Sequence, residues 1–282
     1  MYLSAFDVGV LSTGALAAAC SAQLGVFLVL RRLAMLADAL SHAVLPGIVL
    51  GFLMSGSRSG FGILAASAGA ALACAASIQF LQRYAGLRQD LAIGSSFTFF
   101  FAVGVILITR FAGQVDLDQD CVLYGELAYA PLDPLVVRGL WLGPRSAWVL
   151  GGLFVLTYLV FKVFRSRWVA TSFDPDYARS VGIQTNLWHT LFMAIVALTT
   201  TLTFESVGAV LIIALLVGPA ATALLLTHRL SKVFLYAFLI SVAEVGAGYG
   251  LALATSGNLV GAIGIITGLV YLAVYAVTLK RN

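Results

Sequence analysis

Residues 36–52 read LADALSHAVLPGIVLGF, an apolar stretch that nevertheless carries Asp38, Ser41 and His42. On a helix, Asp38 and His42 are four residues apart and therefore share one face. Ionisable side chains are costly inside a membrane segment, and they usually face a polar path. A carboxylate and an imidazole together suit a metal cation of intermediate hardness. The pair is therefore a candidate metal site, with Ser41 as a further candidate ligand.

Pro46 and Gly47 follow directly and predict a break in this helix. Proline has no N–H to offer the carbonyl of His42, four residues back, and its ring would clash with that carbonyl. Glycine loosens the backbone further. We therefore expect a freed carbonyl close to Asp38 and His42.

The rest of the chain is also strongly apolar. Of its 282 residues, 61% are hydrophobic and 10% are charged, and the mean hydropathy is +1.02. Soluble domains carry about 25% charged residues, so this composition predicts a polytopic membrane protein embedded in lipid. The net charge is only +4, and the basic residues lie at the ends of the apolar segments. This placement indicates that they orient the chain in the membrane and do not bind nucleic acid. Cys20, Cys74 and Cys121 form no CxxC pair and predict neither a zinc cluster nor a disulfide.

Apolar runs of about 20 residues predict eight or nine transmembrane helices in an all-α bundle. We expect one domain over residues 1–282, with the first run as a span rather than a cleaved leader. The predicted spans are 9–30, 34–54, 61–82, 91–111, 147–164, 187–204, 207–227, 233–254 and 259–279. Small residues four apart near the C-terminus predict close helix packing: Gly246, Gly250 and Ala254, Gly257 and Gly261, Gly264 and Gly268.

A longer polar piece, 112–146, separates the fourth and fifth spans and is expected to hold a short helix around 121–129. Asp116, Asp118 and Asp120 alternate within it as in a calcium loop. The glycine and the bidentate glutamate of such a loop are missing from the required positions. A solvated acidic edge is favoured instead, which could draw in cations or dock a partner.

Lysine and arginine predict the orientation, because cytoplasmic loops are enriched in both. If successive spans cross the membrane in opposite directions, twelve of the 16 lysines and arginines fall on one side. The other four, Arg58, Arg110, Arg138 and Arg145, fall on the opposite side. The predicted C-terminus is therefore cytoplasmic and the N-terminus outside.

Residues 172–182 read SFDPDYARSVG and predict a short helix on the cytoplasmic side. Asp174 suits the N-cap and Pro175 the first helical position, while Gly182 is a suitable stop. Ala178 gives this helix a small-residue face. From the pattern alone, a simple surface helix stays an alternative.

Glu244 lies in the middle of the eighth predicted span and should face the bundle interior or water. It is a further candidate on a cation path, either as a ligand or as a gate. The alternative is a structural role as the partner of a threonine or tyrosine.

Three stretches resemble the membrane permeases of the manganese, zinc and iron ABC importers, the metal-type ABC-3 family. They are ADALSHAVLPG at 37–47, SFDPDYARSVG at 172–182 and VGAVLIIALLVGPAATALLL at 207–226. The resemblance implies a permease like those of type II ABC importers, in a bacterial plasma (inner) membrane. It also implies a second permease subunit, identical or related, two cytoplasmic ATPase subunits and an extracytoplasmic metal-binding protein.

The same resemblance implies roles for individual residues. Asp38 and His42 would contact the transported ion, which is manganese, zinc or iron, and no permanently bound cofactor is implied. Manganese is favoured because no cysteine accompanies the pair. The residues implied to couple to the ATPase are Ser172, Phe173, Asp174, Pro175, Asp176, Tyr177, Ala178, Arg179 and Gly182. The chain has no GxxxxGK[ST] loop, so ATP hydrolysis is expected in a separate chain.

An ATP-independent metal carrier, or a membrane-embedded enzyme that uses Asp38, Ser41 and His42, is the alternative. The segment 172–182 discriminates between them, because a carrier has no need of a helix that docks an ATPase. A Ser/His/Asp triad is disfavoured, because three residues within two turns of one helix cannot place nucleophile, base and orienting acid in line.

Overall fold

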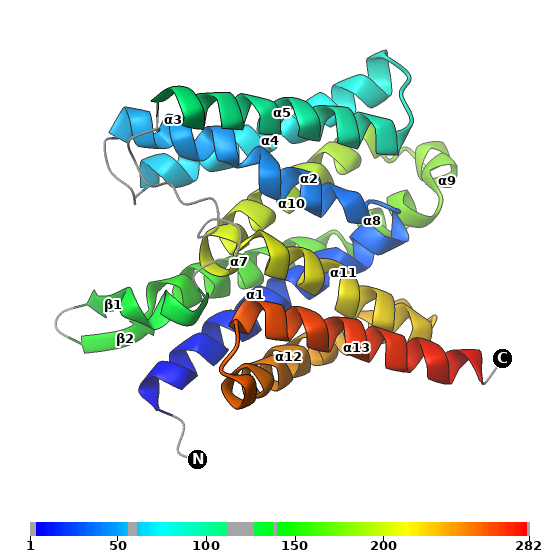
Figure 1. Ribbon diagram of the computed structural model, residues 1–282. Coiled ribbons are helices and arrows are strands. Elements are labelled where there is room, and N and C mark those ends of the chain that lie inside the picture. The colour runs from blue at the N-terminus through cyan, green and yellow to red at the C-terminus, as the bar shows by residue number, and fades with distance from the viewer. Residues whose placement is uncertain (1–3, 56–60, 112–126, 138–139, 281–282) are drawn as a thin grey trace. The chain divides into compact units, whose positions relative to one another are not determined.

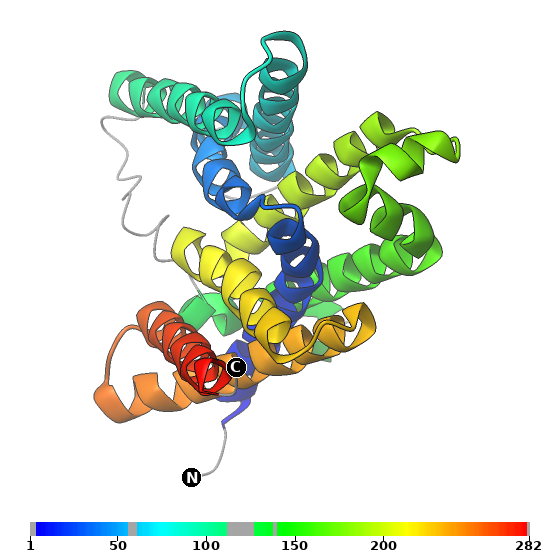
Figure 2. The ribbon, with the colours of Figure 1, turned by 90° about the vertical axis from the view of Figure 1, so that its right-hand side faces the viewer.

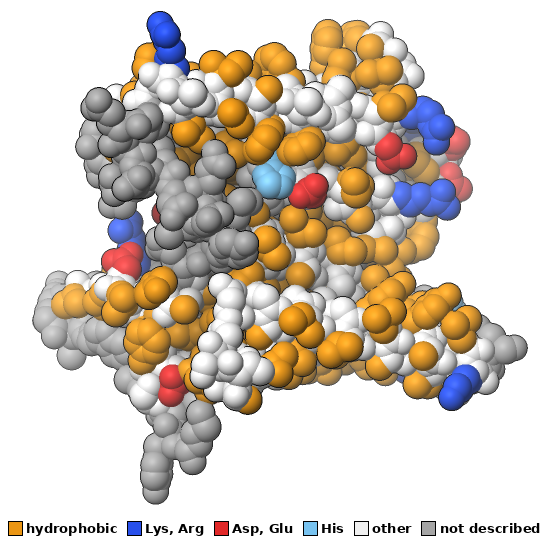
Figure 3. Space-filling view, viewed as in Figure 1, with side chains coloured by type: hydrophobic (Ala, Val, Ile, Leu, Met, Phe, Trp, Pro, Cys, Tyr) orange, Lys and Arg blue, Asp and Glu red, His pale blue; other side chains and the backbone are white. Residues whose placement is uncertain are grey.

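The computed structural model describes residues 4–55, 61–111, 127–137 and 140–280 (Figure 1). Within these ranges, nine segments are long and apolar enough to cross a membrane. They are Phe6–Leu30, Ala34–Ser55, Gly62–Tyr84, Gln89–Phe111, Arg145–Val163, Thr185–Val207, Ala209–Leu226, Leu230–Thr255 and Leu259–Leu279. Hydrophobic side chains are spread over the helix surfaces visible in Figure 3, as lipid-facing helices require. The prediction of an all-α polytopic membrane protein is confirmed, at the higher of the two predicted span numbers.

The described residues form two compact units. The first lies within Met1–Ala34, Leu123–Val163 and Thr203–Asn282, and the second within Met35–Val122 and Phe164–Leu202. One long helix, α10 (Thr185–Val207), begins in the second unit, and its last turn belongs to the first.

Five long helices make up most of the first unit: α1 (Ala5–Leu30), α7 (Arg145–Val163), α11 (Ala209–Leu226), α12 (Leu230–Thr255) and α13 (Leu259–Leu279). Helix α1 packs against α7, α11 and α12, as Figures 1 and 2 show. Small side chains make this possible, since a Cβ on Gly25 would lie 1.8 Å from the carbonyl oxygen of Leu216. The buried cluster between α1, α11 and α12 is accordingly alanine-rich: Ala22, Val26, Ala220, Ala223, Val233 and Ala237.

The prediction that the C-terminal small-residue repeats pack helices within the chain was wrong. Gly246, Gly250, Gly264 and Gly268 have open space where a Cβ would stand. The close contact between α12 and α13 comes from Gly248 instead, where a Cβ would lie 2.6 Å from the Cα of Ile263. Spacing shows where a helix permits close approach, and the neighbouring helix decides which face is used.

The polar piece before α7 contains a 3-10 helix that overlaps the end of the short helix expected at 121–129, and two strands that the sequence did not predict. A 3-10 helix, η1 (Leu127–Leu132), is followed by antiparallel strands β1 (Pro134–Val137) and β2 (Leu140–Pro144). Pro134 pairs with Pro144 and Val137 with Leu140. The remainder of the helix predicted at 121–129 lies outside the described residues, as do Asp116, Asp118 and Asp120.

In the second unit, α2 (Ala34–Ala43) and α3 (Leu45–Ser55) are followed by the long helices α4 (Phe61–Tyr84) and α5 (Gln89–Phe111). Helices α3, α4 and α5 lie side by side (Figures 1 and 2). Ser77 of α4 and Ser96 of α5 place their hydroxyl oxygens 3.2 Å apart, within hydrogen-bond distance.

Two short helices, α8 (Arg165–Phe173) and α9 (Pro175–Ser180), precede α10 in this unit. Trp168 of α8 is buried, and its ring lies 5.0 Å from Trp188 and 6.1 Å from Phe192, both of α10. This aromatic cluster therefore anchors α8 to the beginning of a long apolar helix.

Candidate functional site

Asp38 and His42 lie together on α2, as their spacing predicted. Nε2 of His42 is 3.4 Å from Oδ1 of Asp38, and the two side chains are 23% and 41% exposed, respectively. A carboxylate oxygen and an imidazole nitrogen are thus accessible on one helix face. With the imidazole neutral, both can bind the same divalent transition metal ion.

Two phenylalanines of α5 lie beside the imidazole. The ring centroid of His42 is 5.5 Å from that of Phe97 and 5.7 Å from that of Phe101. The angle to Phe101 is 84°, an edge-to-face contact. The sequence did not indicate this pair, because only the packing of α5 beside α2 brings it to His42.

Ser41 is placed differently from its neighbours. It is fully buried, and its hydroxyl donates a 2.8 Å hydrogen bond to the carbonyl of Ala37 in its own helix. That bond is a common way for a helical serine to satisfy its hydroxyl. Ser41 is thus engaged with the backbone and does not share the accessible face of Asp38 and His42.

The helix break lies at Val44, two residues before Pro46. Helix α2 ends at Ala43 and α3 begins at Leu45, so Pro46 stands in the first turn of α3, where a missing N–H is tolerated. The prediction that Gly47 loosens the backbone was wrong, because Gly47 is part of α3. Its lack of a side chain permits close packing, since a Cβ there would lie 2.5 Å from the carbonyl oxygen of Ala66 in α4.

Glu244 belongs to the first unit, whereas Asp38 and His42 belong to the second. It is 2% exposed on α12, and its Oε2 accepts a 2.9 Å hydrogen bond from the hydroxyl of Thr267 on α13. Its Oε1 is buried and has no hydrogen-bond partner among the described residues. This contact matches the structural alternative for Glu244. In the described part of the chain, no three His, Cys, Asp or Glu side chains form a metal site.

The short helix predicted after Asp174 is confirmed as α9. Oδ1 of Asp174 accepts a 2.9 Å hydrogen bond from the backbone N–H of Tyr177, and Pro175 is the first helical residue. Gly182, with a φ of +81°, follows the helix end in a conformation that favours glycine. Ala178 is fully buried. Ser172 and Phe173 end α8 instead of leading into α9.

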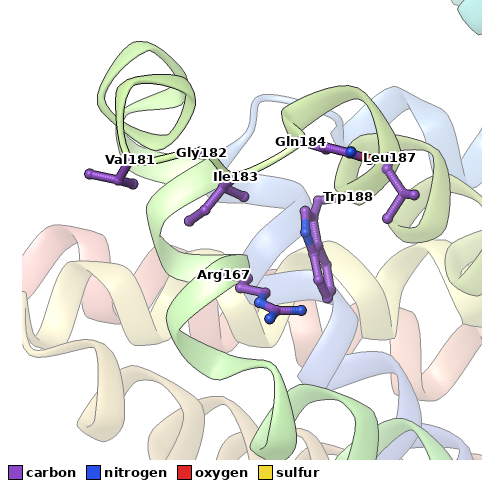
Figure 4. A pocket seen from close by; sticks show the side chains of 7 residues that line it. All are labelled: Arg167, Val181, Gly182, Ile183, Gln184, Leu187 and Trp188. Atoms are coloured by element: carbon purple, nitrogen blue, oxygen red, sulfur yellow. The ribbon is translucent and has the colours of Figure 1, made fainter.

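A cavity of about 400 Å³ opens between α8, the residues after α9 and the start of α10 (Figure 4). The guanidinium of Arg167 lies over the rings of Trp188, at 5.3 Å, and Phe164, at 5.7 Å. The cavity is lined by Arg167, Val181, Gly182, Ile183, Gln184, Leu187 and Trp188. An adjoining cavity of about 560 Å³ adds Arg83 and Arg179 to the lining.

Large apolar side chains are exposed at the end of α8, on α9 and directly after α9. Phe173, Tyr177 and Val181 are 60%, 59% and 53% exposed. We call these three residues and the two cavity linings the α8–α9 surface. The sequence pointed to its helix through Asp174 and Pro175, but gave no signal for Arg167 and Trp188, which only the folding of α8 onto α10 brings together.

The ABC 3 transport family matches residues 5–278 of the chain. The chain is 38% identical over 270 residues to the manganese transport system membrane protein MntD of Bacillus subtilis (strain 168), covering 96% of this chain and 91% of the relative. It is 36% identical over 258 residues to the zinc transport system membrane protein TroD of Treponema pallidum, covering 92% and 70%. The structure of PsaBC from Streptococcus pneumoniae in complex with Fab shares the fold, with a TM-score of 0.78, 24% identity and coverage of 96% and 91%. The chain therefore belongs to the ABC 3 transport family and is a multi-pass membrane permease of the metal ABC transporter type.

Proposed function

We propose that residues 1–282 act as a single permease domain that imports a divalent transition metal, driven by ATP hydrolysis in a separate chain. The observation that carries this proposal is the accessible pair of Asp38 and His42, 3.4 Å apart on α2. Manganese is the favoured cargo, because the pair includes no cysteine and MntD is named for manganese. Zinc, named for TroD, and iron suit the same donors.

The pair needs further ligands, because transition metals usually take four to six. We propose that a second permease subunit, identical or related, supplies its own carboxylate and imidazole across a two-fold axis. Two carboxylates and two imidazoles would then surround the ion. Ser41 contributes no ligand in this arrangement, since its hydroxyl is bonded to Ala37. Glu244 is likewise no ligand in this arrangement and keeps its structural hydrogen bond from Thr267.

We propose that two cytoplasmic ATPase subunits bind the α8–α9 surface, one on each permease subunit. Phe173 and Tyr177 expose aromatic rings, which are enriched at protein interfaces. Among the described residues that line its cavities, the charged ones are arginines and none is acidic, so acidic side chains of an ATPase would fit. Ala178 of α9 is fully buried, so α9 is packed against its neighbours, and movement of the ATPase would pass through it to the helices that carry the proposed metal path.

The proposed orientation in the bacterial plasma membrane follows from the arginines and lysines. It puts the α8–α9 surface and the C-terminus in the cytoplasm and the N-terminus outside. An extracytoplasmic metal-binding protein would deliver the ion to the outer side. No permanently bound cofactor is part of this mechanism.

Manganese uptake tests the proposal in cells that lack their own importers and carry this permease with its ATPase and binding protein. We expect Asp38→Ala and His42→Ala each to abolish uptake at normal membrane levels. Ser41→Ala is the matched control on the same helix and should retain uptake, because alanine suits a helix interior. Near-normal uptake by the Asp38→Ala, His42→Ala double variant would remove the pair from the metal path. Robust uptake by the permease alone in proteoliposomes would favour the ATP-independent carrier.

A further inference from the structure

The imidazole of His42 is held by two different kinds of neighbour. Its Nε2 lies 3.4 Å from the carboxylate of Asp38. The imidazole ring also lies beside Phe97 and Phe101, which are one turn apart on α5 and stack on each other, with centroids 5.8 Å apart and planes at 30°. The imidazole therefore rests against an aromatic wall on a neighbouring helix.

This arrangement differs from the usual support of a metal-binding histidine. Such a histidine normally donates the N–H of its second nitrogen to a carboxylate or carbonyl, which fixes the ring. Among the described residues, no hydrogen bond of this kind to another side chain or carbonyl is seen for His42, whose neighbours are Asp38 and the two phenyl rings. A phenyl ring offers no hydrogen-bonding group, so it can orient the imidazole without competing for its metal-binding lone pair.

We propose that Phe97 and Phe101 are positioning residues that keep Nε2 of His42 directed toward Asp38. The inference rests on the proposed function, in which this pair contacts the metal. Without such support, a histidine side chain that is 23% exposed would sample several rotamers, and metal binding would cost the entropy of fixing one of them. The flat rings restrict that freedom in advance, so the carboxylate and the imidazole meet the ion as one preformed half-site.

The rings of His42 and Phe101 meet edge to face, at an angle of 84°. This geometry needs a flat aromatic side chain at position 101. A branched aliphatic side chain would fill part of the same volume but would place no flat ring beside the imidazole. Replacement by leucine should therefore disturb the orientation of the imidazole more than the packing of α2 against α5. Replacement by tyrosine should preserve it, because the ring is retained.

Binding of manganese(II) chloride to the assembled importer in lipid nanodiscs, with both permease subunits present, tests this inference, with free Mn²⁺ followed by electron paramagnetic resonance. Phe97→Leu and Phe101→Leu should each raise the dissociation constant about tenfold, the effect typical of groups that orient a metal ligand. Phe97→Tyr and Phe101→Tyr should bind like the wild type. Phe99→Leu is the matched control, because Phe99 lies on the same helix, is 63% exposed and has its ring against Phe100.

The outcomes separate this inference from the proposed function. Absent or His42-independent binding in the wild type would count against the pair as a metal site and against both proposals. Binding that requires His42 but is unchanged in both leucine variants would overturn the positioning role alone. Weaker binding that tyrosine fails to rescue, or that Phe99→Leu shares, would mean that the rings only pack the helices. If the leucine variants fail to accumulate, Phe97→Met and Phe101→Met refill the volume without a flat ring and take the same test.

Discussion

Removing the hydroxyl of Thr267 should destabilise the protein, whereas removing both members of the Glu244–Thr267 pair should not. Thr267→Val is a clean perturbation, because valine keeps the methyl group that packs against Gly218 of α11. The change takes away the donor of the 2.9 Å hydrogen bond and leaves the buried carboxyl of Glu244 without a hydrogen bond among the described residues.

The magnitude follows from the asymmetry of buried hydrogen bonds. Leaving one buried polar group unsatisfied costs about 1–3 kcal/mol, while replacing both partners by apolar groups is nearly neutral. Hydrogen bonds between membrane helices average about 0.6 kcal/mol, with a maximum near 1.7. We therefore expect Thr267→Val to lower the unfolding free energy by about 1 kcal/mol. The double variant Glu244→Leu, Thr267→Val should lie within about 0.5 kcal/mol of the wild type, since it leaves no carboxyl to solvate.

Unfolding in mixed micelles titrated with sodium dodecyl sulfate measures these differences on the purified permease. The reasoning is refuted if the double variant loses as much stability as the two single changes together. Manganese uptake by the same variants adds a second readout. Uptake retained by the double variant would leave Glu244 in a structural role, whereas loss of uptake at normal stability would place Glu244 on the metal path.

Three further predictions concern the second unit. Gly47→Val should lower the unfolding free energy by about 1–3 kcal/mol, because its side chain would meet the backbone of α4, whereas Gly69→Val, facing open space, should be far milder in the same titration. Ala178→Trp should leave ATP hydrolysis but stop metal uptake in reconstituted complexes, because α9 has no room for the added ring; unchanged coupling would contradict this. Asp176→Cys, at a side chain that is 90% exposed, should react with an impermeant thiol reagent in inside-out vesicles only. Reaction in right-side-out vesicles would reverse the proposed orientation.

The sequence predicted those elements whose boundaries depend on residues that are adjacent along the chain. Asp174, Pro175 and Gly182 fixed the start and stop of α9, because capping and left-handed backbone are properties of a few consecutive residues. The long apolar runs predicted the membrane spans in the same way, because hydropathy is also a property of consecutive residues. The strands β1 and β2 were missed because they are short and a strong span follows them, although a two-residue connection ending in glycine separates them.

Contacts between helices could not be predicted in the same way. The spacing of Asp38 and His42 showed that they share a face, but nothing local to α2 indicates that Phe97 and Phe101 will lie against it. The bond of Glu244 to Thr267 likewise requires the register of α12 against α13. The spacing of small residues does not predict which of them lies at a helix contact for the same reason, since Gly248 faces a neighbouring helix and Gly246 does not.

The break at Val44 would place the two proposed metal donors, His42 and Asp38, at unequal distances from a point about which α2 could tilt. Helix α3 is fixed against α4 through Gly47, so a tilt of α2 would turn about Val44. At a rise of about 1.5 Å per residue, His42 stands about 3 Å from that fulcrum and Asp38 about 9 Å. A tilt of about 10° would therefore swing the carboxylate by about 1.5 Å and the imidazole by only about 0.5 Å. The imidazole, beside Phe97 and Phe101, would then be the nearly stationary one of the two proposed donors, and the carboxylate the one whose distance to a bound ion changes most.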